Sequence, residues 1–284
     1  MAVARHESGV VAAGKALASQ IHPVFMLPPL ATSLFGAILA GGVDLAVAGL
    51  HTLAMFFAVY TAHVKDGYVD FHVRGEDDDH PLTVGGCRGA LVAAAVGFLV
   101  CTVGLWLLVS PLVALVTLPT WIIGYTHAPQ LDLTPIGATM GYPGGIALAL
   151  LGGYYAQATT VGPQVAGLAA VFLLLLTGIK IIDDETDYDY DRSIEKRTVA
   201  VVLGPRRGRR LALALFAAAM GGVVALAAVL PGIPPTAGGA AVVFGAVLAV
   251  AYRADAKLAT MLLIRGSYLF LAVLIVAVWF RPLT

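Results

Sequence analysis

The sequence predicts an all-α, polytopic membrane protein with nine transmembrane helices and with its N-terminus in the cytoplasm. Two observations predict this class. Hydrophobic residues make up 59% of the 284-residue chain and charged residues only 12%, and the mean hydropathy is +0.89. These values exclude an ordinary soluble domain. The chain also contains nine apolar stretches close to the length of about 20 residues that crosses a bilayer.

The nine stretches follow one another with polar or Gly/Pro-containing breaks between them. Two of the breaks are very short, Ser110-Pro111 and Gly162-Pro163. Because proline can begin a helix but disrupts its interior, these breaks predict tight turns between antiparallel helices. We expect the spans at residues 24–42, 46–64, 87–109, 111–127, 143–160, 163–182, 211–231, 236–252 and 257–280.

The orientation follows from the distribution of basic residues, which accumulate in short cytoplasmic loops. With the N-terminus in the cytoplasm, all of the 17 Lys and Arg residues except Arg281 fall on the cytoplasmic side. We therefore expect a single nine-helix domain over residues 1–284 in the cell membrane. A short tail at 1–20 and cap loops at 65–86, 128–142 and 183–210 lie on the cytoplasmic side.

Other composition signals exclude several classes. The net charge is zero, so nothing favours a nucleic-acid partner. Cys87 and Cys101 lack the spacing of a metal site or a disulfide framework, and we interpret both as buried packing residues. No cleavable signal peptide is evident in the first 20 residues.

An acidic segment follows the apolar run at residues 171–179. Asp183, Asp187 and Asp191 recur at every fourth residue. On a continuous helix these side chains form a ladder along one face, with rungs about 6 Å apart. A merely solvated helix end is the alternative, but the regular period and the adjoining apolar helix favour a cation site.

A second acidic segment follows the second apolar stretch. Asp66 and Asp70 are again four residues apart. Carboxylate oxygens are the ligands that Mg²⁺ prefers, in sites that it shares with substrate phosphates. We therefore expect the two segments to face each other as one Mg²⁺ site, whereas the run from Glu76 to Asp79 is typical of a solvated surface.

Basic residues accompany both acidic segments. Lys65 and Arg74 flank the first pair, and Lys196 and Arg197 follow the ladder. They are candidate donors to diphosphate oxygens that a metal leaves uncovered. A basic group before the seventh stretch is better explained by topology and lipid headgroups; it contains Arg206, Arg207, Arg209 and Arg210.

These residues resemble the motifs of the UbiA superfamily of intramembrane prenyltransferases over essentially the whole chain. The superfamily's second motif, DxxxDxxxD, is complete as Asp183, Asp187 and Asp191, and DRSIEKRTVAVVLG resembles the DRxxGKRTLAVxLG that usually follows. The first motif, NDxxDxxxD, matches in part, with Asp66 in the Asn place, Asp70 retained, and Gly67 and Arg74 where acids are usual. His80-Pro81-Leu82 resembles the common Arg-Pro-Leu, and the segment from Tyr125 to Pro129 resembles YSxxP.

The resemblance implies an enzyme that transfers a polyprenyl group from a polyprenyl diphosphate to a lipophilic acceptor, such as an aromatic quinone precursor, a lipid or another isoprenoid. It implies two Mg²⁺ ions, one held by Asp66 and Asp70 and the other by Asp183 and Asp187, with Asp191 direct or through water. It also implies that the nine helices surround a central cavity, with the active site on the cytoplasmic face. The donor's tail would lie among the helices, in contact with membrane lipid. Candidate substrate-binding residues are Lys65, Tyr68, Arg74, Tyr125, His127, Lys196 and Arg197, and Tyr188 is a further aromatic candidate.

Three other functions are compatible with parts of the pattern. A membrane terpene cyclase of the same superfamily would use the same aspartates, because it also ionises a diphosphate. A cation transporter would place acids near the bilayer midplane, whereas these gather at one face. A CDP-alcohol phosphotransferase also begins a motif with Asp-Gly, but its further spacing is absent. The acceptor and the prenyl chain length stay open.

Overall fold

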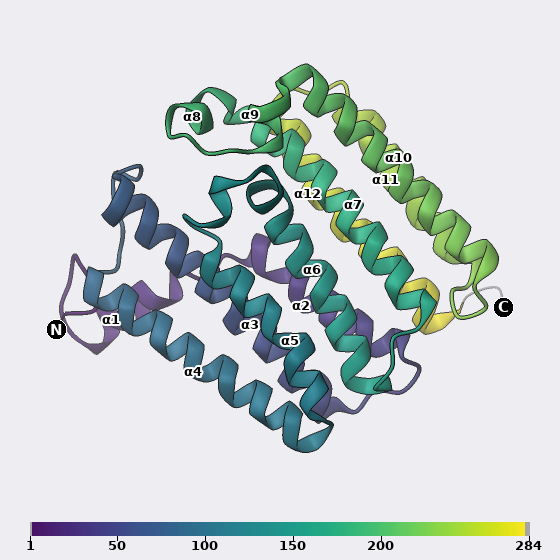
Figure 1. Ribbon diagram of the computed structural model, residues 1–284, viewed down its shortest axis with the longest axis horizontal. Coiled ribbons are helices and arrows are strands. Elements are labelled where there is room, and N and C mark those ends of the chain that lie inside the picture. The colour runs from purple at the N-terminus through teal and green to yellow at the C-terminus, as the bar shows by residue number, and fades with distance from the viewer. Residues whose placement is uncertain (1, 282–284) are drawn as a thin grey trace.

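The computed structural model describes residues 2–281, and these form an all-α bundle (Figure 1). In the described chain no strand occurs, and β-type pairing is limited to one isolated bridge between Ala4 and Leu82. The elements are α1 (Val10–Ala18), α2 (Pro23–Leu39), α3 (Leu45–Gly67), η1 (Tyr68–Arg74), α4 (Val84–Leu108), α5 (Pro111–Thr126), η2 (Leu131–Leu133), α6 (Pro135–Ala158), α7 (Pro163–Thr186), α8 (Tyr188–Ser193), α9 (Val199–Leu203), α10 (Pro205–Val229), η3 (Pro235–Gly238), α11 (Gly239–Ala251) and α12 (Ala256–Phe280). Of these, η1 is a π-helix, and η2 and η3 are 3₁₀ helices.

Each expected apolar stretch coincides with a helix of the bundle: α2, α3, α4, α5, α6, α7, α10, α11 and α12. Within the described residues, six candidate spans are long and apolar enough to cross a membrane, and the α1–α2 pair, bent by 68°, would make a seventh. The helices at Pro111–Thr126 and Pro235–Ala251 are shorter. The chain is therefore an integral membrane protein of six or seven candidate spans, and nine spans stays a prediction.

Helix starts are set by proline and by capping side chains. Five long helices begin with proline, where the missing N–H has no intrahelical partner to lose. Others begin after a residue whose side-chain oxygen accepts a backbone N–H, such as Asp44 before α3 and Thr83 before α4. The predicted breaks at Pro111 and Pro163 are confirmed as the first residues of α5 and α7.

The backbones of α2 and α6 touch. A Cβ atom at Gly36 would lie 2.2 Å from the Leu150 carbonyl oxygen, and one at Gly153 would lie 2.1 Å from the Ser33 carbonyl oxygen. Only glycine fits at either position. Close contact through small residues is the usual way in which membrane helices pack, and here it brings the first half of the chain against the second.

The largest core lies among α2, α6, α7, α10, α11 and α12. Its centre is a set of buried aromatic rings, with Phe172 and Phe270 5.5 Å apart and Phe216 and Phe244 5.5 Å apart between ring centroids. A smaller core joins α3, α4, α5 and α6 around Met55 and Phe98. The bundle is thus packed as two groups of helices that share α6.

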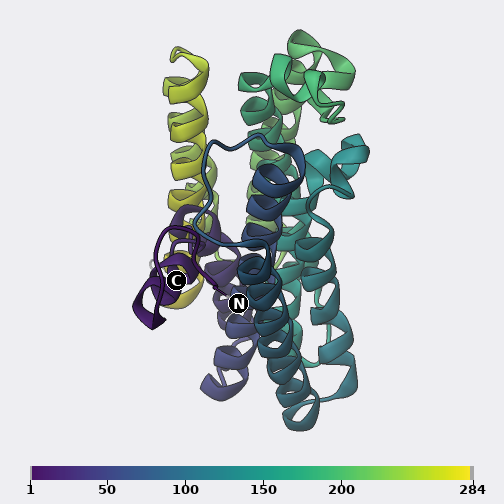
Figure 2. The ribbon, with the colours of Figure 1, turned by 90° about the vertical axis from the view of Figure 1, so that its left-hand side faces the viewer.

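The N-terminal residues are structured, whereas the sequence predicted a plain tail over 1–20. Residues 10–18 form α1, and the backbone N–H of Arg5 donates to the Pro81 carbonyl at 2.9 Å. The Thr83 hydroxyl donates to the Ala2 carbonyl at 2.7 Å. Figure 2 shows this segment and the loop before α4 on the side of the bundle that faces the viewer.

The expected cap loops contain more helix than predicted. The helix over 45–67 continues as η1 to Arg74, and α6 begins at Pro135, inside the expected loop 128–142. Between 183 and 210, the end of α7, α8, α9 and the first turn of α10 are helical. Hydropathy detects only the apolar part of each helix, so the charged ends that project beyond it were assigned to loops.

Candidate functional site

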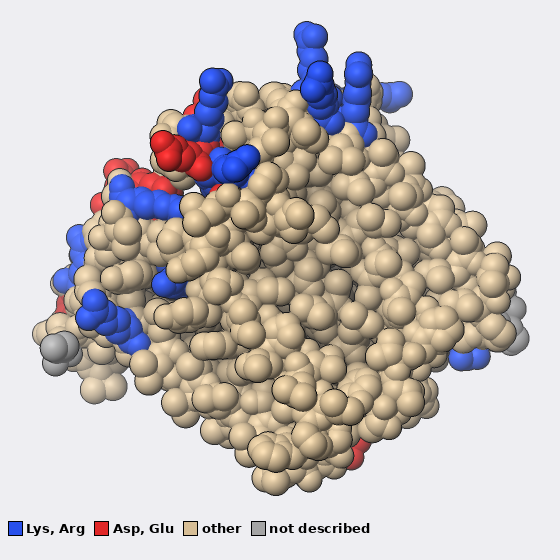
Figure 3. All heavy atoms as spheres, in the orientation of Figure 1, with Lys and Arg blue, Asp and Glu red and all other residues tan. Residues whose placement is uncertain are grey.

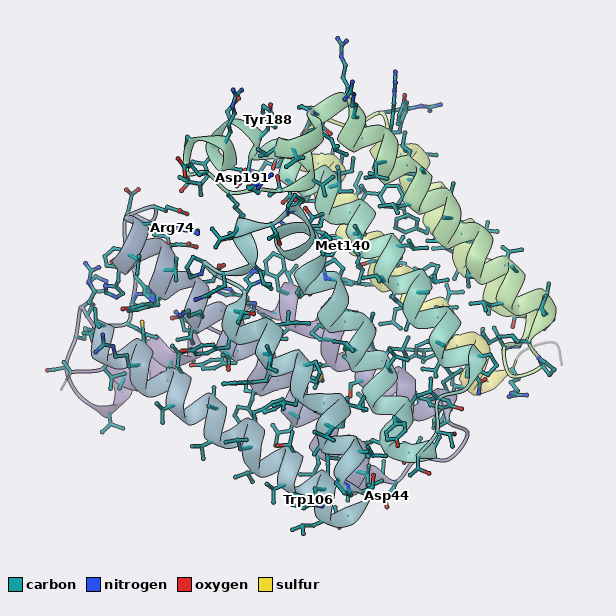
Figure 4. All side chains as sticks on the ribbon, in the orientation of Figure 1. Asp44, Arg74, Trp106, Met140, Tyr188 and Asp191 are labelled. Atoms are coloured by element: carbon teal, nitrogen blue, oxygen red, sulfur yellow. The ribbon has the colours of Figure 1, made fainter. Side chains whose placement is uncertain are left out.

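Charged side chains gather at one end of the bundle. In Figure 3 the Lys, Arg, Asp and Glu side chains lie mostly along the top and left edges, and the top edge is formed by the end of α3, by α8 and by the start of α10. The rest of the broad face is nearly free of them. Figure 4 places Arg74, Tyr188 and Asp191 at this end, and Asp44 and Trp106 at the opposite end. The two acidic segments therefore share one end, as predicted.

The first acidic segment lies where α3 passes into η1. Asp66 is in the last turn of α3 and Asp70 is in η1, and both side chains are half-buried. A π-helix is rare and is found most often at functional sites. Here it ends at Gly75, which takes a left-handed backbone conformation with φ of 67°.

Arg74 is the centre of an ion-pair network in this segment. Its guanidinium lies 2.8 Å from Asp132 and 3.6 Å from each of Asp70 and Glu76. Asp132 is buried in η2, and its carbonyl oxygen accepts the backbone N–H of Arg197 at 2.9 Å. Arg74 therefore connects the first acidic segment to the α5–α6 loop and, through Asp132, to the chain that follows the second segment.

The second acidic segment is not one continuous helix, so the predicted ladder of three rungs is wrong in this respect. The helix α7 ends at Thr186, Asp187 caps it with a φ of −105°, and α8 begins at Tyr188. Asp183 is half-buried, Asp187 is exposed and Asp191 is buried. The four-residue spacing identified the three aspartates but did not detect the break between the second and third.

A fourth aspartate, Asp184, has the most buried carboxylate of this segment. Its side chain is 1% exposed, lies 2.7 Å from the Lys180 ammonium and accepts the Thr139 hydroxyl at 3.2 Å. Lys180 also contacts Asp183 at 2.9 Å. Lys180 and Asp184 were not among the predicted site residues, although their i, i+4 spacing indicates such an ion pair.

These carboxylates have the chemistry of a divalent-cation site. Asp183 and Asp184 already converge on one cationic group, the Lys180 ammonium, with oxygen atoms 2.7 to 2.9 Å from it. The donors are all carboxylate oxygens, which fit Mg²⁺ better than a soft metal. The residues of this segment therefore fit the predicted ion.

Asp191 lies on the inner side of α8. Burial raises the pKa of its carboxyl group to about 6, and Lys196, whose ammonium is 3.6 Å away, opposes this shift. Tyr190, on the same helix, lies close to Glu76 of the first segment. Desolvation and this neighbouring carboxylate raise the pKa of the Tyr190 hydroxyl to about 12. The two acidic segments are thus electrostatic neighbours.

A pocket of about 460 Å³ extends from the second acidic segment into the apolar part of the bundle, between α2, α6, α7 and α12. Lys180 and Asp183 lie at its polar end, and the remaining lining is mainly apolar. The expected central cavity stays a prediction, because the lining of this pocket includes Asp183 of the second acidic segment but neither Asp66 nor Asp70 of the first. The lining residues of the pocket are Val24, Phe25, Pro28, Tyr142, Leu176, Ile179, Lys180, Asp183, Ile264, Ser267 and Tyr268.

Two tyrosines of this pocket donate to backbone carbonyls that two prolines leave without a helical partner. Pro28 and Pro29 lack the N–H groups that would otherwise bond to the carbonyls four residues earlier, those of Val24 and Phe25. The Tyr268 hydroxyl donates to the Val24 carbonyl, and the Tyr142 hydroxyl donates to the Phe25 carbonyl at 2.7 Å. Neighbouring helices therefore satisfy the carbonyls that the prolines free, as the bilayer environment requires.

The other predicted substrate-binding residues lie around the first segment and the α5–α6 loop. The Lys65 ammonium lies 5.0 Å from the centroid of the Tyr125 ring, and His127 is the C-cap of α5. Tyr68 packs instead against the core of α1, α3 and α4, with its ring 5.6 Å from that of His72. The structure brings Lys65 and Tyr125 together and packs Tyr68 against a different core.

Comparison with known proteins gives a family and several structural neighbours. The chain matches the sequence model of the UbiA prenyltransferase family over residues 29–274. The apo structure of a UbiA homolog from Aeropyrum pernix K1 has a TM-score of 0.72 at 21% identity, covering 90% of this chain and 98% of that one. A structure described for digeranylgeranylglyceryl phosphate synthase in membranes has a TM-score of 0.73 at 14% identity, covering 94% and 99%.

A third solved structure is a UbiA homolog from Archaeoglobus fulgidus bound to GPP and Mg²⁺. It has a TM-score of 0.67 at 17% identity and covers 94% of this chain and 99% of that one. At these identities the likeness concerns the fold. The comparison with curated protein sequences found no match.

Proposed function

Since the chain belongs to the UbiA prenyltransferase family, we propose that it transfers a polyprenyl group from a polyprenyl diphosphate to a lipophilic acceptor within the membrane, in a Mg²⁺-dependent reaction. The observation that carries the proposal is the meeting of two acidic segments at one end of the bundle, with an apolar pocket that begins at Asp183. The A. fulgidus homolog solved with GPP and Mg²⁺ supports this choice of substrate and ion.

The proposal assigns two ions to the two segments. Asp66 and Asp70 would hold one, and Asp183, Asp187 and Asp191 the other. When bound, Mg²⁺ neutralises negative charge on the diphosphate and so makes it a better leaving group. The buried Asp184 carboxylate lies 2.7 Å from the Lys180 ammonium. Asp184 is therefore a positioning residue for Lys180 at the polar end of the pocket.

Basic side chains would bind the diphosphate oxygens that the ions leave free. Lys65, Arg74, Lys196 and Arg197 are the predicted donors, and Lys180 is added because it lies at the mouth of the pocket. Each donor stabilises the charge that develops on the leaving diphosphate. Arg74 is already oriented by Asp132, Asp70 and Glu76, so it loses little freedom on binding.

The apolar pocket would hold the beginning of the prenyl chain. The carbon–oxygen bond of the donor breaks, its electron pair leaves with the diphosphate, and an allylic cation remains. The apolar lining excludes water that would otherwise attack this cation. The acceptor's nucleophilic atom then forms a bond to the cation carbon and releases a proton.

We place the site on the cytoplasmic side of the membrane. The acidic end faces the cytoplasm, because all Lys and Arg residues except Arg281 belong to the tail, loops and helix ends that this orientation puts there. Nine spans then place the C-terminus on the other side, with α5 and α11 as the two short ones.

The test is incubation of the purified protein with geranylgeranyl diphosphate, Mg²⁺ and a panel of lipophilic acceptors, with products read by mass spectrometry. We expect a prenylated acceptor and released diphosphate, and we expect Asp183→Asn and Asp187→Asn each to lower diphosphate release at least about a hundredfold. Asp189→Asn is the matched control, because Asp189 is exposed on the same acidic segment and outside the assigned set. Full activity of both test variants would refute the assignment, and a cyclised hydrocarbon formed without acceptor would show a terpene cyclase instead.

A further inference from the structure

Three side chains with nitrogen and sulfur ligand atoms meet on the side of η1 that packs against α4. They are His72 in η1, His80 in the following loop and Cys87 in the first turns of α4. One ligand atom from each lies within 4.8 Å of the other two. None of these residues belongs to the proposed diphosphate site. From this cluster we propose that the protein binds one Zn²⁺, or a divalent cation of similar softness, at His72, His80 and Cys87.

The distances suit a common ion. Zinc binds imidazole nitrogen at about 2.0 Å and thiolate sulfur at about 2.3 Å in a tetrahedral arrangement, so ligand atoms in such a site lie about 3.5 Å apart. The Cys87 sulfur and the His80 Nε2 are 3.5 Å apart already. The His72 and His80 ring centroids are 5.7 Å apart, and all three ligand atoms lie within 4.8 Å of one another, so the widest pair would close by about 1 Å on binding.

The surroundings orient one histidine for this role. The His72 Nε2 lies 3.1 Å from the Leu82 carbonyl oxygen. A carbonyl only accepts, so Nε2 carries the proton and the neutral ring keeps its lone pair on Nδ1. Metal-binding histidines almost always donate their other N–H to such an oxygen.

The burial and chemistry of the cluster select the kind of metal. His80 is 4% exposed and Cys87 is fully buried, while His72 is half-buried. Two imidazoles and a thiolate favour Zn²⁺ over Mg²⁺, which prefers oxygen ligands. The aspartates of the diphosphate site have the opposite preference, so the two sites discriminate between the two ions.

The packing of Gly67 supports a built site. A Cβ atom at position 67 would lie 2.9 Å from the His80 Cε1 and 3.4 Å from its Nε2. Glycine at 67, where an acid is usual in the resembled motif, therefore leaves the space that the His80 ring fills. The ion would fasten η1, which carries Asp70 and Arg74, to α4, and so it would stabilise the segment rather than take part in the transfer reaction.

The test uses Co²⁺ as a spectroscopic probe on the full chain, purified in detergent, reduced and freed of metal. We expect one equivalent of Co²⁺ to produce a thiolate-to-cobalt charge-transfer band that Zn²⁺ removes and excess Mg²⁺ does not. Cys101→Ser is the matched control, because Cys101 is the other buried cysteine of α4, and it should keep the band. Cys87→Ser should abolish it.

A second variant covers the case in which Cys87→Ser is unstable. His72→Gln keeps the thiol and an amide donor for the Leu82 carbonyl, and it should weaken binding at least about tenfold. Zn²⁺ should also raise the thermal unfolding midpoint of the wild type and not that of His72→Gln. Lack of the band in the wild type, or binding by Cys87→Ser or His72→Gln equal to that of the wild type, would overturn the proposal.

Discussion

Two single residues depart from the resembled motif, Gly67 immediately before η1 and Arg74 at its end, and the structure gives a physical reason for each. Gly67 makes room for His80, since any Cβ there would be 2.9 Å from that ring. Arg74 replaces an acid and pairs with Asp70, Glu76 and Asp132. The segment therefore has fewer carboxylates than the motif implies and makes more contacts with neighbouring segments.

The first prediction concerns the contact between Gly67 and His80. Gly67→Ala should lower the stability by about 1 to 3 kcal/mol relative to Gly49→Ala, because the added methyl group displaces a buried ring. Gly49 is a matched control within α3, since a Cβ there meets nothing within 4 Å. Thermal unfolding in detergent measures the difference, and equal midpoints for the two variants would contradict the packing argument.

At the scale of the element, the ends of α3 and α7 determine the site. Both helices extend beyond their apolar part and carry their carboxylates on that extension, α3 through a π-helix and α7 up to a break at Asp187. The break sets α8 apart from the axis of α7, and Asp191 is buried on it. These local changes of helix type decide which carboxylates face the shared end.

The second prediction concerns the Arg74–Asp132 ion pair, which connects η1 to η2. In a double-mutant cycle, Arg74→Gln and Asp132→Asn should be coupled by about 1 to 3 kcal/mol in unfolding free energy, because the pair is 2.8 Å apart and mostly buried. The pair of Arg209 and Glu185, at 3.6 Å and with the arginine 39% exposed, is the control and should show coupling below about 1 kcal/mol. If the two substitutions changed the unfolding free energy additively, the Arg74–Asp132 ion pair would contribute nothing to stability.

At the scale of the whole molecule, charge divides the bundle into two ends. The acidic segments and most basic residues lie at one end, and Asp44 lies at the other (Figure 4). The two groups of helices meet through α6, whose close contact with α2 depends on Gly36 and Gly153. The pocket that begins at Asp183 opens within this arrangement, between helices from both halves of the chain.

The third prediction concerns orientation in the membrane. Both native cysteines are buried, so a membrane-impermeant maleimide should report on an introduced cysteine at an exposed position. Asp78→Cys lies at the acidic end and should react only after the cells are opened, whereas Gly42→Cys at the opposite end should react on intact cells. The reverse pattern would place the acidic end outside and refute the cytoplasmic site.

Composition, periodicity and motif spacing determined the all-α membrane class, the approximate place of nine apolar helices and the family. Each of these depends on local sequence: apolar length, proline and glycine breaks, and carboxylates at fixed intervals. Asp66, Asp70, Asp183, Asp187 and Asp191 were selected by the same means. The nine spans, the orientation and the roles of these residues stay predictions.

Only the tertiary structure decided which residues contact one another across the fold. The helix break at Asp187, the burial of Asp184 between Lys180 and Thr139, and the pairing of Arg74 with Asp132 depend on how separate helices pack. The cluster of His72, His80 and Cys87 arises in the same way, because its residues lie on η1, in the following loop and on α4, and their spacing matches no common metal motif. Sequence spacing reports on neighbours along one helix, whereas these contacts are set by the relative positions of several.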